Sequence, residues 1–151
     1  MTSEEMITIG EIYLNPDHSS GKMVILKETP AADRYFLMFV GDTEFAAIAK
    51  EKGLLQSARP LTHDLYVSIV EKTSLEFLRI EITDMRENTY YANVIFRVKD
   101  LEHAVDSRPS DAVALALKKK IPIRVKEKLF RPELTEDQVK EYEQIVKTVK
   151  F

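Results

Sequence analysis

The sequence predicts a single α+β domain in which helices pack on a largely antiparallel or mixed β-sheet. Its length of 151 residues fits one domain with a substantial hydrophobic core. Segments rich in β-forming residues occupy the first forty residues, and segments with a period of two occupy the centre of the chain. Segments with helical spacing lie between and after them. Strands and helices interleaved in this way favour the α+β class.

Composition excludes several classes of protein. The chain has no cysteine, so disulfides and thiolate metal sites are excluded. No apolar run approaches the roughly 18 residues that a membrane span needs, and residues 1–5 are acidic where a signal peptide would be basic. We therefore expect a soluble, cytoplasmic protein with no membrane partner. The formal net charge of −3 means that any binding to nucleic acid has to come from a local basic patch.

Three β-rich segments open the chain, at residues 6–14, 22–28 and 34–40. The stretches between them are rich in Asn, Pro, Asp, Ser and Gly, which favour turns. We therefore expect an antiparallel meander. We assign residues 1–20 to an N-terminal strand region and residues 21–131 to the main domain.

Two helices follow the meander. Asp42 or Thr43 can cap a helix that runs through residue 52, and Gly53 occupies the usual stop position. Thr62 can cap a second helix, in which apolar residues form i,i+4 pairs. The core should lie beneath these two helices.

A long hairpin is predicted from residue 75 onward. Strict alternation places Phe77 on the same side of its strand as Arg79, with Ile80 on the other side. Residues 86–88 turn the chain into a strand at 90–98 that is partly covered on both faces, and residues 99–102 lead to a short strand at 103–106. Asp106 thus lies at the carboxyl end of a strand, a common position for ligand sites in open α/β sheets.

The run from residue 106 to residue 117 is the most informative part of the chain. Pro109 suits a first helical turn, Ser107 or Arg108 can take the N-cap position, and Asp111 then lies near the positive end of the helix dipole. Three lysines at 118–120 close this buried helix at its negative end. A short apolar strand at 121–125 follows.

The C-terminal segment, residues 132–151, is predicted to form an amphipathic helix. It opens with a capping-box pattern at 135–138 and continues with a stripe of apolar residues. Such a helix would pack on the body of the protein or on another subunit. Together with the apolar sheet edge, this pattern leads us to expect a homo-oligomer.

Two sequence blocks resemble the bifunctional nuclease domain family, which was first described in bacteria and plants as a domain of unknown function. One is Asp-Ser-Arg-Pro-Ser-Asp-Ala-Val-Ala-Leu-Ala-Leu at residues 106–117, followed by a Pro-Ile strand. The other is Arg-Pro-Leu-Thr-His-Asp-Leu at residues 59–65. Residues 80–84 and 89–92 match the hairpin of the family, and residues 41–48 match its first helix start. The resemblance covers roughly residues 24–129.

The resemblance implies a nuclease that hydrolyses phosphodiester bonds of DNA and RNA with the help of a divalent metal, Mg²⁺ or Mn²⁺. Such chemistry needs a neutralised phosphate, an activated water and a stabilised leaving oxygen. The candidate catalytic residues are Glu44, His63, Asp64, Asp106 and Asp111. Arg59 and Arg108 are candidate phosphate-binding residues. The candidate metal ligands are Glu44, Asp106 and Asp111.

Other interpretations of the same residues remain open. Asp106, Arg108 and Asp111 also fit a capping and ion-pair cluster that locks the turn into the helix. His63 also fits a first-turn helix residue at the surface, or one hydrogen-bonded to Asp64 or to a neighbouring carbonyl. The main alternative function is a non-catalytic binding or regulatory module that holds a phosphate-bearing ligand or a protein partner. A hydrolase of small phosphoesters is a third possibility.

Overall fold

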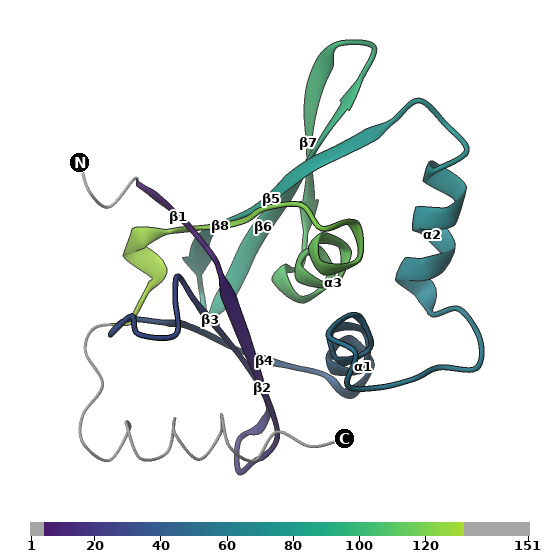
Figure 1. Cartoon of the computed structure of the whole chain (residues 1–151). Coiled ribbons are helices and arrows are strands. Elements are labelled where there is room, and N and C mark those ends of the chain that lie inside the picture. Colours follow the sequence, from purple (N-terminus) through teal and green to yellow (C-terminus); the bar gives the residue numbers. More distant parts are fainter. Residues whose placement is uncertain (1–4, 132–151) are drawn as a thin grey trace.

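The computed structural model describes residues 5–131 (Figure 1). The predicted C-terminal helix at 132–151 lies outside the described residues. The strands are β1 (Met6–Thr8), β2 (Glu11–His18), β3 (Gly21–Lys27), β4 (Phe36–Val40), β5 (Glu76–Arg86), β6 (Thr89–Val98), β7 (Leu101–Ser107) and β8 (Ile123–Lys126). The helices are α1 (Asp42–Glu51), α2 (Thr62–Val70), α3 (Pro109–Lys119) and the short 3-10 helix η2 (Glu127–Leu129).

The strands form two sheets, and the predicted α+β class is confirmed. One sheet has the order β1-β8-β5-β6-β7 and is mixed, because β5 and β8 run parallel while the other pairs are antiparallel. The other sheet is the antiparallel meander β2-β3-β4. The predicted meander is therefore confirmed, except that residues 6–8 leave it to pair with β8.

Gly10 stands where the chain passes from one sheet to the other. A Cβ atom at this position would collide with the backbone carbonyl oxygen of Glu28. Only glycine allows so close an approach of two backbones. The residues before 21 thus contribute to both sheets, β1 to the mixed sheet and β2 to the meander.

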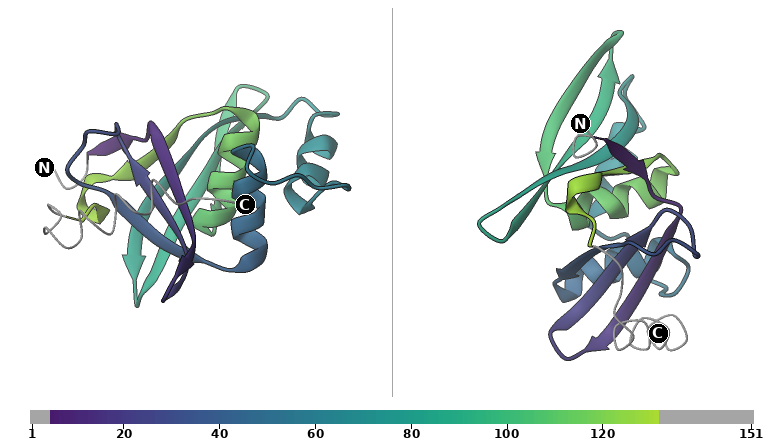
Figure 2. Two further views of the ribbon diagram at one scale, coloured as in Figure 1. Left: turned by 60° about the horizontal axis from the view of Figure 1, so that its bottom comes forward. Right: turned by 90° about the vertical axis from the view of Figure 1, so that its left-hand side faces the viewer.

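Two helices lie between the sheets and carry much of the core (Figure 2). α1 packs against α3 and β3, and α3 packs against β5 and β6. The buried residues of α3 are largely small, including Ala112, Ala114 and Ala116, which allows close packing against its neighbours. α2 lies outside this layer and contacts α3. Within residues 5–131, no helix is long and apolar enough to cross a bilayer.

The hairpin of β5 and β6 departs from strict alternation. A bulge between Phe77 and Arg79 places Phe77 opposite Phe96, while Ile80 pairs with Val94. Phe96 and Val94 lie on one face of β6, so Phe77 shares the face of Ile80. The expectation that Phe77 points the same way as Arg79 is therefore wrong, because one extra residue reverses the alternation.

Candidate functional site

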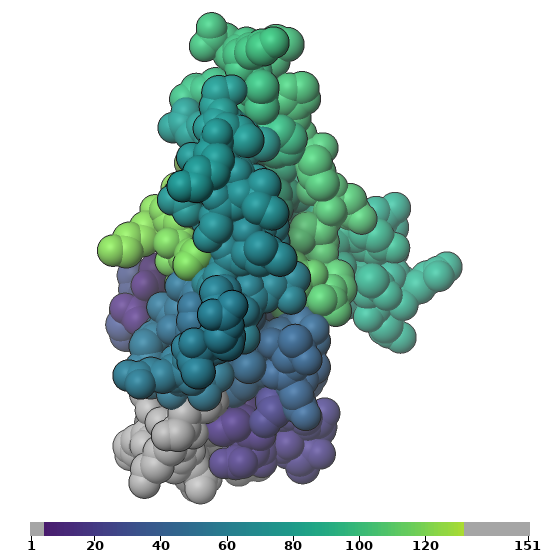
Figure 3. All heavy atoms as spheres, turned by 90° about the vertical axis from the view of Figure 1, so that its right-hand side faces the viewer, coloured from purple at the N-terminus to yellow at the C-terminus, as the bar shows by residue number. Residues whose placement is uncertain are grey.

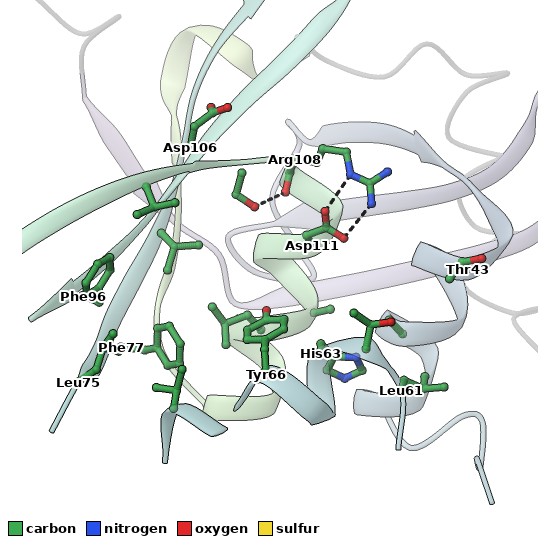
Figure 4. A pocket seen from close by; sticks show the side chains of 18 of the residues that line it. Thr43, Leu61, His63, Tyr66, Leu75, Phe77, Phe96, Asp106, Arg108 and Asp111 are labelled. Atoms are coloured by element: carbon green, nitrogen blue, oxygen red, sulfur yellow. Dashed lines mark hydrogen bonds and ion pairs between the residues drawn. The ribbon is translucent and has the colours of Figure 1, made fainter. Parts of the chain in front are cut away.

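A cleft of about 630 Å³ lies between α2, α3 and the face formed by β5, β6 and β7. Figure 3 views the molecule from the side of α2, and Figure 4 looks into the cleft. Most of its lining is apolar, and this part includes Tyr66, Leu75, Phe77, Val94, Phe96 and Val105. The polar part of its lining includes Thr43, Thr62, His63, Asp106, Arg108 and Asp111.

The N-terminal ends of α1, α2 and α3 all contribute to the polar part of the cleft. Their N-cap residues are Gly41, Leu61 and Arg108, each in an extended conformation. Asp42 or Thr43 was expected to cap α1 and Thr62 to cap α2, but Asp42 and Thr62 are the first helical residues. α3 begins at Pro109, where the missing N–H costs nothing. Because helix N-termini carry partial positive charge and unpaired amides, their convergence favours an anionic ligand.

Arg108 lies at the rim of the cleft and joins α3 to α1. Its Nε and one terminal nitrogen donate to the two carboxylate oxygens of Asp111, at 2.8 Å and 3.1 Å. The terminal nitrogen also lies 3.4 Å from a Glu44 oxygen. Asp111 and then Glu44 raise the pKa of Arg108, so its guanidinium keeps its charge. With 64% of its side chain exposed, Arg108 can reach a ligand in the cleft.

Asp64 lies behind the wall of the cleft and links all three helices. It is 5% exposed and accepts hydrogen bonds from Lys50 Nζ at 2.8 Å and from the Leu61 amide at 2.7 Å. Lys118 Nζ lies 2.8 Å from its other oxygen. Burial alone would raise the pKa of Asp64, but Lys118, Lys50, the Leu61 amide and His63 outweigh it and hold that pKa well below its usual range.

His63 is buried, yet its ring contributes to the cleft lining. Its Nε2 atom lies 2.6 Å from Oε2 of Glu51 and 3.5 Å from Oδ1 of Asp64. Sequence reasoning missed Glu51, which stands at the end of α1 and is brought to His63 only by the packing of α1 against the start of α2. A carboxylate bonded to one ring nitrogen fixes the orientation of an imidazole.

Tyr66 is a second residue that sequence reasoning did not single out. It lines the cleft one helical turn beyond His63. Burial and the charge of Asp111 raise the pKa of Tyr66 to about 12, so its hydroxyl is a neutral donor at ordinary pH. In Figure 4 its ring lies between His63 and the phenylalanines of the sheet.

Glu51, His63 and Asp64 form a possible metal-binding group, since one ligand atom from each lies within 4.8 Å of the others. Two ammonium groups already share this space. Lys50 Nζ lies 2.8 Å from Asp64 and 3.6 Å from Glu51, and Lys118 Nζ lies 2.8 Å from Asp64. The two lysines balance the two carboxylates, so a divalent ion would add uncompensated positive charge. The group is therefore a poor fit for a divalent ion while both lysines stay in place.

The predicted site residues separate into three sets. The first set lines the cleft and comprises His63, Arg108 and Asp111. Asp106 also borders the cleft, but its side chain points to the opposite face of β7 (Figure 4). Glu44 joins the first set through Arg108, and Asp64 lies behind this set, in contact with His63. Arg59 stands apart from both, in the exposed loop between α1 and α2, and is not among the residues that line the cleft.

Comparison with known proteins identifies the family. The family model described as the bifunctional nuclease domain matches residues 24–138, and the chain belongs to this family. Two uncharacterized proteins of Mycobacterium tuberculosis are 35% identical over 116 residues, which cover 77% of this chain and 69% of theirs. Bifunctional nuclease 1 of Arabidopsis thaliana is 26% identical over 113 residues, or 73% of this chain and 35% of that protein.

Proposed function

We propose that this protein is a nuclease that hydrolyses phosphodiester bonds of DNA and RNA at the cleft beside α2. Membership of the bifunctional nuclease domain family supports a nuclease-like function. The observation that carries the proposal is that His63 and Arg108 line one cleft, each held by a carboxylate. An oriented imidazole and a guanidinium are the base and the anion-binding group that phosphodiester hydrolysis needs.

Arg108 is the proposed phosphate-binding group. Its planar fork matches two phosphate oxygens, and its charge offsets the negative charge that develops there during cleavage. Asp111 and Glu44 hold the guanidinium at the rim from two different helices. The first-turn amides of α3, which begins directly after Arg108, add partial positive charge on the same side.

His63 is the proposed general base. Its contact with Glu51 occupies Nε2, so Nδ1 is the ring nitrogen that would face a substrate water. Nδ1 takes a proton from the water as its oxygen bonds to phosphorus, and the leaving oxygen takes a proton from solvent water as its bond to phosphorus breaks. Glu51 and Asp64 are positioning residues in this scheme, because they act through His63 and the helix starts.

A divalent ion, Mg²⁺ or Mn²⁺, fits the half-exposed carboxylate of Asp111 at the rim of the cleft better than the buried group around Asp64. Asp111 offers hard oxygen ligands, with Glu44 nearby through Arg108. The Asp106 side chain alternates with Val105 and Ser107 along β7 and points away from Asp111 (Figure 4). Magnesium is commonly held by one or two carboxylates together with substrate phosphates. When bound, it would supply charge neutralisation and a more acidic water.

A non-catalytic binding module is the second candidate. The predominantly apolar lining of the cleft favours it, since the ionic groups occupy only one part. In that case Arg108 and the helix starts would hold a phosphate-bearing ligand or a protein partner without bond cleavage. Self-association of the chain also remains a proposal.

The test is cleavage of single-stranded and double-stranded DNA and RNA by purified protein with Mg²⁺ or Mn²⁺. We expect His63→Gln and Arg108→Gln each to lower the rate by about a hundredfold or more. The matched control is His18→Gln, because His18 lies in the meander and outside the cleft lining. Wild-type protein that binds these nucleic acids but cleaves none of them would favour the binding module.

A further inference from the structure

Three aromatic side chains form a row across the mixed sheet at the apolar end of the cleft. Phe77 on β5 lies opposite Phe96 on β6, and Phe96 lies opposite His103 on β7. The rings of Phe96 and His103 are stacked, with centroids 5.3 Å apart and an angle of 20° between their planes. Directly opposed residues point to the same side of a sheet, so all three rings stand on the cleft face.

The row is accessible in the described part of the chain. Phe77 and Phe96 line the cleft and are only partly buried, and His103 is exposed. Figure 4 shows the two phenylalanines at one end of the cleft, with Arg108 and Asp111 at the other. β7 connects these ends directly. From His103 to Ser107, just before Arg108, it spans about 13 Å at the usual rise of a strand.

We propose that this row is a stacking platform for the unpaired bases of single-stranded nucleic acid, whose backbone lies against Arg108. This inference rests on the proposed function, because it names the substrate class of the same cleft. Aromatic rings on a sheet face stack bases of any sequence, and a guanidinium at one end binds the phosphates. Bases inside a duplex have both faces covered by their neighbours, so the platform selects single strands.

The combination of an apolar row of rings with a positive charge at the other end of the cleft favours nucleic acid over a second copy of the chain. A copy of this protein would have to bring an acidic group to Arg108 and a large apolar group to Phe96 in the same contact. A single nucleotide carries both parts, a flat base and an anionic phosphate, on one flexible unit. The neutral hydroxyl of Tyr66, between the two ends, adds a hydrogen-bond donor for a base or a sugar.

The test measures binding separately from cleavage. The probes are a fluorescent oligothymidylate of about 12 nucleotides and an abasic strand of the same length, titrated with full-length protein in chelator and followed by anisotropy. The variant is Phe77→Leu with Phe96→Leu, which keeps apolar volume but removes both ring faces. Tyr91→Leu is the matched control, because Tyr91 lies on the opposite face of β6, where Arg86 covers its ring.

We expect wild type and Tyr91→Leu to bind the oligothymidylate alike and the double leucine variant to bind it about tenfold or more weakly. Affinity for the abasic strand should be equal in all three proteins. If the leucine variant binds each strand with the same affinity as wild type, the platform is overturned, even if the protein cleaves nucleic acid. Binding that depends on the rings in a protein that cleaves nothing would support the platform and reject the nuclease.

Two further measurements serve as controls for this interpretation. Circular dichroism and thermal unfolding establish that the leucine variant is folded. If it is not, the single variant His103→Ala takes its place, because His103 is exposed and its loss leaves the core intact. Sedimentation of wild type and variant is the second measurement. A dimer in wild type that the leucine variant loses would assign the row to contact between copies and overturn the proposal.

Discussion

The Nε2 atom of His63 lies 2.6 Å from Oε2 of Glu51, which stands 12 residues earlier in the chain. The pair joins the last residue of α1 to the first turn of α2. Both side chains are largely buried, with 6% and 14% of their area exposed. This contact turns a histidine with several possible roles into one with a fixed ring orientation.

Glu51→Gln is expected to lower the turnover number for nucleic-acid cleavage by about ten- to a hundredfold and to leave KM nearly unchanged. The amide can still bond to the ring, but it no longer stabilises a charged imidazole. Nitrogen NMR of the imidazole provides the second measurement, since a changed tautomer or ring environment reports on positioning. Glu71→Gln is the control, because Glu71 is more than half exposed and 3.9 Å from Lys119. An unchanged turnover number with an altered NMR signal would show that Glu51 has no part in the reaction.

Asp64→Asn is expected to destabilise the fold by about 3 kcal/mol at neutral pH, because it leaves Lys50 and Lys118 beside a neutral group in a buried place. Urea unfolding measures this loss. Asp42→Asn serves as the control, since the Asp42 side chain is 91% exposed. A loss below about 1 kcal/mol would argue against the structural role of Asp64.

The pH dependence of the same variant follows from the lowered pKa of Asp64. The folded protein keeps this carboxylate charged where the unfolded chain has already bound a proton. Its stabilising contribution is therefore complete above about pH 4 and is lost as the pH falls toward the folded pKa. Wild type should lose more stability than Asp64→Asn between neutral pH and about pH 3. Parallel pH profiles for the two proteins would contradict this assignment.

Asp111→Asn separates a catalytic role from a structural one. The pair with Arg108 is 64% and 49% exposed, so its loss should lower the free energy of unfolding by less than about 1 kcal/mol. If Asp111 aligns Arg108 or holds a metal ion, cleavage should fall by about a hundredfold with little change in Tm. Activity per folded molecule close to wild type, together with a lower Tm, would reduce Asp111 to an ion-pair partner.

Cleavage is expected to stop in chelator and to return with Mg²⁺ or Mn²⁺. Mn²⁺ titration followed by electron paramagnetic resonance locates the ion without reference to activity. Glu44→Gln with Asp111→Asn should weaken Mn²⁺ binding, whereas Glu51→Gln should not. The reverse pattern would assign the ion to Glu51, His63 and Asp64, which would require displacement of Lys50 from Asp64. Full activity in chelator would point to acid–base chemistry alone.

The order of elements, and the helix starts to within one or two residues, could be predicted from the sequence, because local chemistry decides them. Pro109 and the lysines at 118–120 bracket α3 as expected, and the turn residues separate β2, β3 and β4. Motif resemblance also identified the family. The face of Phe77 could not be predicted, since a bulge depends on the pairing of β5 with β6, and pairing is a long-range property.

The sequence by itself determined the α+β class, the family and the chemical types at three helix starts, because each depends on short stretches of neighbouring residues. Only the tertiary structure decided which of those groups meet. It brought Glu51 to His63, placed Asp64 between Lys50 and Lys118, and left Arg59 outside the cleft. The physical reason is that contacts between helices depend on how the buried faces of α1, α2 and α3 pack together, and no local sequence pattern specifies that packing.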